Sequence, residues 1–232
     1  RELISAIEQT LAAGEQAVLF LNRRGYYSFI SCRDCGHSIV CSHCAVTLSY
    51  HAGSNGGRLK CHYCGEAQAP PQLCPYCGSR HIRSFGVGTQ RVADEAARLF
   101  PGSRVARLDS DVMEERGWHQ QIYQRMQSRQ VDILVGTQMV AKGLDFPHLQ
   151  LAAVIAADTM LNLPDWRAGE YTFQLVSQLI GRAGRRERQG RAIIQTYNPE
   201  ALPIVAAANH DYQGFYRYEL EQRRLHGYPP YN

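Results

Sequence analysis

Residues 31–44 read SCRDCGHSIVCSHC, and these four cysteines interrupt a chain that has just begun an α/β sheet with AVLFLNRRGYYSFI at 17–30. Two further pairs, CHYC at 61–64 and CPYC at 74–77, complete the eight cysteines of the chain. A disulfide across a two-residue gap is strained, and a chain without a secretory signal stays reduced. Paired thiolates are instead typical ligands of structural Zn²⁺. We therefore interpret 32–83 as a zinc-binding insertion.

Four C-x-x-C pairs supply two zinc ions, and three groupings of the pairs are possible. Only five residues separate Cys35 from Cys41, which disfavours pairing in sequence order. A nested arrangement closes the inner loop first and brings both ends of the segment together, as an insertion into a sheet requires. The nested ligand sets are Cys41, Cys44, Cys61 and Cys64 for one ion, and Cys32, Cys35, Cys74 and Cys77 for the other.

Four thiolates leave zinc no open coordination position, so we expect both ions to be structural. The nearby histidines are then not needed as ligands; they are His37, His43, His51 and His62. A glycine follows three of the four pairs and is expected to take a positive φ there. We expect the segment to hold almost no apolar core of its own, so metal binding, about 10 kcal/mol per site, should supply its fold.

Charge does not indicate the partner of this segment. The whole chain has 25 basic and 21 acidic residues, a formal net charge of +4. Within 32–83 a small basic excess is cancelled by eight thiolates and two Zn²⁺, which leaves the segment close to neutral. DNA binding therefore gains no support from charge, and a protein-docking or strand-guiding surface that uses His62, Tyr63 and Tyr76 is equally compatible.

The remainder of the chain alternates between strand and helix patterns, which predicts an α/β fold with a largely parallel sheet covered on both faces. Thr89 is the expected N-cap of the helix at 91–100. Ligands bind such sheets at the carboxyl ends of the strands, where NRRGY, GTQMVAKGLDFP and ADTMLNLPDWR follow apolar runs. The expected helices are 3–11, 91–100, 117–126 and 171–181, and the expected strands are 17–21, 104–109, 131–136, 151–157 and 191–197.

The stretch QLIGRAGRR at 178–186 combines two glycines with closely spaced arginines. If the helix continues, Gln178, Arg182 and Arg185 share one face. Two guanidinium groups a turn apart suit phosphate oxygens, and one of them can act as an arginine finger. A solvated basic face is the alternative, but it has no use for two poor helix formers.

ILVGTQMVAKGLDFP followed by QLIGRAGR resembles motifs V and VI of superfamily-two helicases. PDWRAGEYTFQL, the terminal YPPY and the paired-cysteine insertion extend the resemblance, over essentially the whole chain, to the bacterial replication-restart helicases. The resemblance implies a RecA-like second helicase lobe at 1–31 and 84–210, the zinc insertion at 32–83, and the start of a C-terminal region at 211–232. It also implies a cytoplasmic, nucleoid-associated enzyme that uses ATP and Mg²⁺ to unwind DNA 3′ to 5′ at stalled forks. Its implied partners are DNA, other primosome proteins and single-strand-binding protein.

The same resemblance assigns roles to individual residues. Arg182 and Arg185 would face the γ-phosphate, with Arg185 as the finger, and Gln178 would couple the nucleotide to the lobe. Thr137 would contact the DNA backbone. Gly143 and Asp145 would lie near the nucleotide and the lobe interface, and Arg23 and Arg24, in the motif IV position, are weaker candidates for contact with the DNA strand.

Some features depart from this picture. Gln90 stands where the family pattern has an acidic residue, so its role is left open. No G-x-x-x-x-G-K-[ST] stretch occurs, so the chain by itself is not expected to hydrolyse ATP and is expected to belong to a longer protein. Two alternatives remain: a zinc-dependent interaction module on a scaffold without motor function, and a motor that acts on RNA.

Overall fold

The computed structural model describes residues 1–22, 28–53, 57–85, 88–108, 118–137, 146–181 and 190–231. The chain divides into two compact units. The first comprises Arg1–Arg23, Val87–Ala157 and Leu175–Gln195, and the second comprises Arg24–Gly86, Asp158–Gln174 and Thr196–Asn232. The cysteine segment therefore shares its unit with two later parts of the chain.

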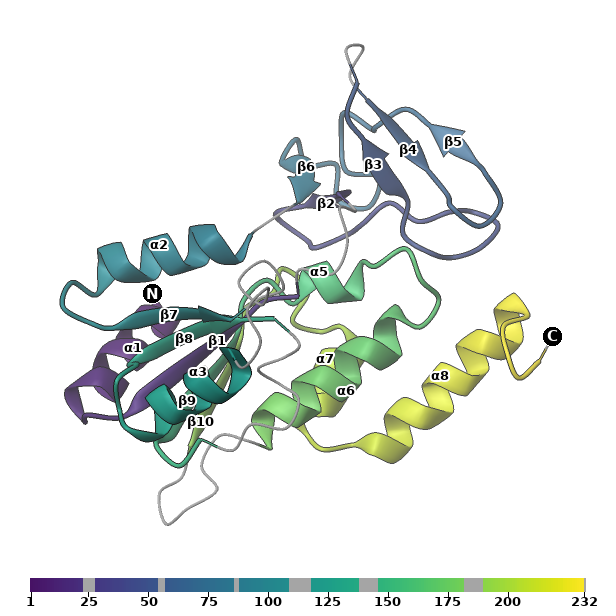
Figure 1. Ribbon diagram of the computed structural model, residues 1–232. Coiled ribbons are helices and arrows are strands. Elements are labelled where there is room, and N and C mark those ends of the chain that lie inside the picture. The colour runs from purple at the N-terminus through teal and green to yellow at the C-terminus, as the bar shows by residue number, and fades with distance from the viewer. Residues whose placement is uncertain are drawn as a thin grey trace. The chain divides into compact units, whose positions relative to one another are not determined.

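A five-stranded parallel sheet forms the centre of the first unit, as the alternation of strands and helices predicts (Figure 1). Its strand order is β10-β9-β1-β8-β7. The strands are β1 (Gln16–Phe20), β7 (Val105–Leu108), β8 (Ile133–Gly136), β9 (Leu149–Val154) and β10 (Arg191–Ile194). The four residues of β8 and all five of β1 are buried, which is typical of a central strand with both faces covered.

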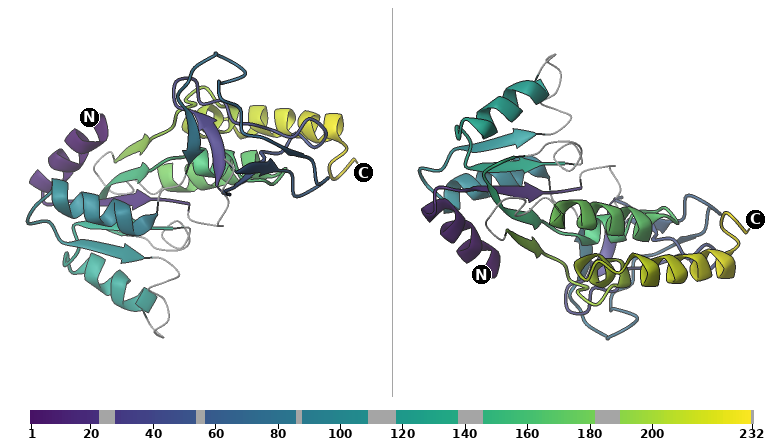
Figure 2. Two further views of the ribbon diagram at one scale, coloured as in Figure 1. Left: turned by 90° about the horizontal axis from the view of Figure 1, so that it is seen from above. Right: turned by 90° about the horizontal axis from the view of Figure 1, so that it is seen from below.

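Alternate residues of the sheet pack against different helices. Leu19 and Val135 point to the face covered by α1 (Glu2–Ala12) and α2 (Thr89–Leu99). Leu134 points to the opposite face, where Met126 of α3 (Trp118–Gln127) packs. Figure 2 shows α3 and α1 on opposite sides of the sheet. This two-residue period follows from the pleat of the strands, and it gives the unit one apolar layer on each side of the sheet.

The starts of α2 and α6 differ from those predicted by more than one residue. Gly88, with extended backbone, is the N-cap of α2, and Thr89 is the first helical residue and fully buried, so the prediction of Thr89 as the N-cap is wrong. Helix α6 (Ala168–Ile180) begins three residues before the predicted 171. Its first turn is nucleated by Asp165, whose C=O accepts from Ala168 N–H at 3.0 Å and whose carboxylate accepts from Arg167 N–H at 2.9 Å.

The cysteine segment is built on two small antiparallel sheets. Strand β2 (Phe29–Cys32) pairs with β6 (Ile82–Phe85), so the two ends of the segment meet, as the nested arrangement requires. The other sheet has the order β3 (Ser49–His51), β4 (Arg58–Lys60) and β5 (Ala67–Gln68).

An apolar cluster lies inside this segment, so the expectation of almost no core is wrong. Its buried aliphatic members come from β2, β4 and the loop around the second cysteine pair, and they pack with two of the cysteines. They are Ile30, Ile39, Val46, Leu48 and Leu59. This cluster could not be predicted from the sequence, because the cysteine turns interrupt any regular spacing of its apolar residues.

In the described part of the chain, four helical segments follow β9: α5 (Asp158–Leu161), α6, α7 (Leu202–Ala208) and α8 (Tyr212–His226). Asp211 caps α8 by accepting from Gly214 N–H at 2.8 Å, and Gly227 ends it in the left-handed conformation. Phe215 of α8 stacks on Phe173 of α6, with ring centroids 4.3 Å apart. Among the described residues, no helix is long and apolar enough to cross a membrane.

Candidate metal centres and motor motifs

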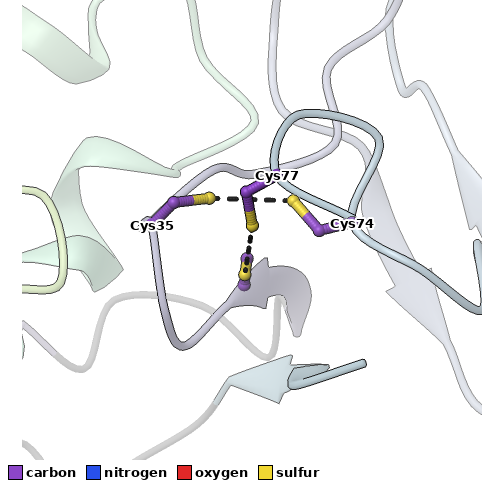
Figure 3. A group of neighbouring side chains, drawn as sticks. Cys35, Cys74 and Cys77 are labelled. Atoms are coloured by element: carbon purple, nitrogen blue, oxygen red, sulfur yellow. Dashed lines mark hydrogen bonds between the residues drawn. The ribbon is translucent and has the colours of Figure 1, made fainter. Parts of the chain in front are cut away.

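The thiols gather in two groups of four. Site A consists of Cys32, Cys35, Cys74 and Cys77, and the four sulfur atoms all lie within 4.8 Å of one another. The Sγ atoms of Cys35 and Cys74 are 3.7 Å apart, as are those of Cys32 and Cys77 (Figure 3). Site B consists of Cys41, Cys44, Cys61 and Cys64, with the Sγ atoms of Cys41 and Cys64 3.5 Å apart. These are the two nested sets.

The same turn occurs at all four cysteine pairs. The N–H of the first cysteine donates to the C=O five residues later, and the N–H of the residue after the second cysteine donates back to the first cysteine, at 2.8–3.1 Å throughout. The residue after the second cysteine has positive φ in each turn. The glycines Gly36, Gly65 and Gly78 do so as predicted, and Ala45 does so too, with φ 52°.

The spacing of the sulfur atoms suits zinc. Four sulfurs placed tetrahedrally at about 2.3 Å from Zn²⁺ lie about 3.8 Å from one another. The contacts of 3.5–3.7 Å in the two sites are close to this separation. Each site buries two of its cysteines, and each offers four soft donors. The chain therefore carries two four-cysteine sites that fit structural zinc.

Without metal, the thiols of one site differ in acidity. Burial raises the pKa of Cys35 to about 12. Burial also acts on Cys32, but hydrogen bonds from the backbone of Cys35 and Asp34 outweigh it and lower the pKa of Cys32 to about 7. Zinc binds thiolates, so loading the site must release the protons that the more basic thiols carry at neutral pH.

Glu66 lies beside site B and was not identified from the sequence. Its carboxylate accepts from Cys41 Sγ at 2.8 Å and from Ser42 N–H at 3.3 Å, and His43 Nδ1 lies 3.5 Å away. Burial and this hydrogen bond raise the pKa of Cys41. Its position directly after the third cysteine turn is the feature of the sequence that could have identified it as a neighbour of the metal site.

Three other histidines of the segment make ring contacts. His37 stacks on Tyr76 at 5.6 Å, and His51 meets His62 edge-on at 5.4 Å. The Tyr76 side chain is largely exposed, at 78%. These rings lie on the surface of the segment, where the sequence suggests a docking or strand-guiding role for Tyr76 and His62.

The carboxyl ends of the central strands lie at one edge of the sheet. Leu21 N–H, just after β1, donates to Gly136 C=O at 2.8 Å, and Ile155 N–H, just after β9, donates to Phe20 C=O at 2.7 Å. Thr137 follows β8 at the same edge and donates its N–H to Leu108 C=O at 3.2 Å. Thr137 is thus placed where sheets of this class bind ligands.

Gln178 is exposed in the last turn of α6. The other predicted motor residues lie outside the described residues; they are Arg23, Arg24, Gly143, Asp145, Arg182 and Arg185. Gln90, whose role the sequence left open, donates to Asp94 Oδ1 at 2.7 Å and accepts from Arg107. These contacts tie the first turn of α2 to β7.

Two short stretches without assigned chemistry, PDWRAGEY and YPPY, meet at site B. Tyr228 stacks on Trp166 with centroids 5.4 Å apart and rings inclined by 14°. The Tyr228 hydroxyl donates to Cys44 C=O at 2.6 Å. Burial raises the pKa of Tyr228 to about 12, so the hydroxyl keeps its proton at neutral pH. No local pattern indicates that these stretches touch site B, because the bonded groups lie 184 positions apart in the chain.

Comparison with known proteins agrees with this arrangement. The family model described as the PriA DNA helicase Cys-rich region domain matches 41–68, which contain all of site B, and the helicase conserved C-terminal domain matches 83–187. The replication restart protein PriA of Bacillus subtilis is 51% identical over 99% of this chain. The chain belongs to the PriA family. The PriA proteins of Synechocystis and Treponema pallidum are each 44% identical, over 100% and 99% of the chain. The chain spans about a third or less of these PriA relatives, 28–34% of their length.

Within the PriA family, the chain corresponds to the C-terminal helicase lobe together with its cysteine-rich zinc module. The parallel sheet and the inserted two-site module have the fold class predicted from the sequence.

Proposed function

We propose that this chain is the second motor lobe of an ATP-dependent helicase that unwinds DNA 3′ to 5′ at stalled replication forks. The observation that carries the proposal is its 51% identity to a PriA protein over 99% of its length. The position of Thr137 at the carboxyl edge of the sheet is consistent with it. We place the complete enzyme in the bacterial cytoplasm at the nucleoid, with primosome proteins and single-strand-binding protein as partners.

In this proposal the lobe contributes phosphate and DNA contacts to a site shared with another lobe. Arg185 inserts as the finger beside the γ-phosphate, Arg182 binds a neighbouring phosphate oxygen, and Gln178 transmits the nucleotide state to α6. A guanidinium suits this role because it stays charged and presents several donors to phosphate oxygens. ATP and Mg²⁺ supply the phosphoryl chemistry when bound.

The remaining motif residues address DNA and the boundary of the nucleotide site. Thr137 donates its hydroxyl to a backbone phosphate, and Arg23 and Arg24 add positive charge on the same strand. Gly143 and Asp145 line the nucleotide side. Because phosphate contacts are independent of sequence, this set fits a motor that translocates along any DNA.

Both zinc ions have a structural role in the proposal. Each site has four sulfur donors and therefore no open coordination position for water or substrate. The ions hold the four cysteine turns and the apolar cluster around Leu48 and Leu59 as one module.

The decisive variant is Arg185→Ala in the full-length protein. An arginine finger contributes about a thousand-fold or more to hydrolysis, so DNA-stimulated ATP turnover should fall by at least that factor. Fork binding should change less than twofold. Arg191→Ala is the matched control, since Arg191 lies at the amino end of β10 and pairs with Glu2 at 2.8 Å. Near-normal turnover in Arg185→Ala would remove the motor assignment.

A further inference from the structure

A second group of possible metal ligands adjoins site B. The donor atoms of Cys41, His43, Cys64 and Glu66 all lie within 4.8 Å of one another. We call this group the outer set. It shares Cys41 and Cys64 with site B, and it has an imidazole and a carboxylate in place of the other two thiols. Thiolate sulfur, imidazole nitrogen and carboxylate oxygen are all ligands that Zn²⁺ accepts.

The outer set is more open to solvent than site B. In site B, Cys41 and Cys61 are buried, and only Cys64 is exposed. In the outer set, both Cys64 and His43 are exposed. The exposed fraction is 71% for the His43 side chain and 26% for that of Glu66. An ion that arrives from water can therefore reach the imidazole and the carboxylate before it reaches the buried thiol of Cys61.

Glu66 is held in this position by the first turn of site B. Its carboxylate accepts from Ser42 N–H at 3.3 Å and from the Ser42 hydroxyl at 3.2 Å, although Glu66 itself follows the second turn. The Ser42 hydroxyl also lies 3.3 Å from His43 Nδ1. These contacts place both additional donors beside the thiols that the outer set shares with site B.

The contact between Glu66 and Cys41 indicates a role of Glu66 toward the metal ion itself. Cys41 Sγ donates to the carboxylate at 2.8 Å, a bond that needs the proton of the thiol. Zinc binds thiolates, so this bond is absent when the ion is bound. Two anionic groups then lie side by side, which is unfavourable unless a cation binds both of them. Glu66 is therefore better suited to bind the ion than to support the Cys41 thiolate.

Site A has no second set of this kind among the described residues. The carboxylate in its first turn, Asp34, accepts from Ser79 Oγ at 2.6 Å and lies 3.1 Å from His81 Nδ1. These bonds direct the carboxylate toward side chains other than thiols. Site A lies in the same unit and is built from the same turns, so it provides an internal comparison for site B.

We propose that the outer set is a transfer site through which Zn²⁺ enters and leaves site B. On entry, His43 and Glu66 give way as ligands to the two inner thiols, while the two shared thiols stay bound. Two coordination bonds form for the two that break, so the ion keeps four donors. The four-cysteine set is the resting position because thiolates are the softer ligands. This inference goes beyond the motor assignment and does not depend on it.

Release of zinc from the loaded, full-length protein into excess EDTA tests the transfer site. Pulses of N-ethylmaleimide label the freed thiols at intervals, and fragment spectra assign the label to each cysteine, so the two sites are followed separately. Competition with a chromogenic chelator gives the dissociation constant. A group that acts only during transfer changes binding and release by the same factor and leaves the dissociation constant unchanged. A group that only supports a ligand changes the affinity, by about 10- to 100-fold.

Glu66→Gln keeps the size of the side chain and one oxygen acceptor but removes the charge. Zinc release from site B should slow by about tenfold or more, with the dissociation constant changed less than about threefold. Release from site A should be unchanged. His43→Gln, at a largely exposed position, should slow release from site B in the same way. Asp34→Asn, the matched change beside site A, should leave release from site B unchanged.

Two results would overturn the transfer site. The first is release from site B at the wild-type rate or faster in both the Glu66 and the His43 variant. The second is equal slowing at both sites, which would indicate a change of the whole module. Should Glu66→Gln fail to hold zinc, His43→Gln decides in the same assay. Neither result involves ATP turnover, so the motor assignment stands or falls separately with Arg185→Ala.

Discussion

Replacing Gly36 by alanine should weaken zinc binding at site A far more than the same replacement of Gly78. Each glycine follows the second cysteine of a turn in site A, and each has φ 72°. A positive φ costs an alanine about 1–2 kcal/mol. Since the fold of such a site is linked to its metal, this cost appears as a loss of zinc affinity of about 5- to 30-fold, at 1.4 kcal/mol for each factor of ten.

The surroundings of the two glycines differ. A Cβ on Gly36 would lie 2.6 Å from the Tyr197 carbonyl oxygen and 2.8 Å from its carbon, whereas a Cβ on Gly78 meets nothing within 4 Å. Backbone atoms cannot rotate away as a side chain can. The added methyl group at Gly36 should therefore cost about 1–3 kcal/mol more, the usual cost of overpacking. Gly36→Ala should therefore bind zinc about 5- to 150-fold more weakly than Gly78→Ala.

Competition with a chromogenic chelator measures both affinities on the full-length protein. Alkylation of the cysteine peptides identifies which site has lost its ion. Equal losses in the two variants would refute the close contact between the first turn of site A and Tyr197.

Three further outcomes are expected. Elemental analysis should find two zinc ions per chain, and chelation should remove hydrogen-exchange protection from 28–85; one ion, or protection retained after complete metal removal, would contradict two structural sites. Ala45→Gly should tighten zinc binding at site B by about two- to fivefold, because glycine accepts the positive φ that alanine holds there at a cost; weaker binding would count against that cost. Asp132→Asn should lower the free energy of opening of β7 and β8, measured by hydrogen exchange, by about 1 kcal/mol at pH 7. The reason is that the hydrogen bonds from Arg104 stabilise the ionised carboxylate and lower the pKa of Asp132. That stabilisation is present above the unfolded pKa and is lost as pH falls through the lowered pKa, so the difference from wild type should shrink below about pH 4; a difference independent of pH would exclude the ion pair as its source.

The grouping of the eight cysteines was predictable because loop closure is local. Cys41 and Cys44 lie close in sequence to Cys61 and Cys64, and the inner loop closes before the outer one. The parallel sheet was predictable for a similar reason, since β1 and β8 are apolar runs with polar residues at their carboxyl ends. Both inferences use patterns that can be recognised within a few tens of consecutive residues.

The anchoring of the zinc module was not predictable from such patterns. Tyr228 and Cys44 belong to opposite ends of the chain, and nothing in YPPY or CSHC indicates the other. The contact between Gly36 and Tyr197 could not be predicted from the sequence either, because Gly36, Gly65 and Gly78 occupy equivalent positions in turns with the same hydrogen bonds. Only the packing distinguishes Gly36, where a Cβ would meet backbone atoms, from Gly65 and Gly78, where it would meet nothing within 4 Å.

The pairing of Phe29 with Phe85 also bears on the evolutionary history of the lobe. These two residues are paired across β2 and β6, so the segment between them starts and ends at neighbouring positions in space. The pairings of β1 with β8 and β9 involve no residue of that stretch. One recombination event at this point could therefore give a helicase lobe its metal module, or remove it, without shifting the register of the parallel sheet. Residues outside that stretch nevertheless contact it, so loss of the module would also deprive Tyr197 of its contact with Arg33 and Tyr228 of its hydrogen bond to Cys44.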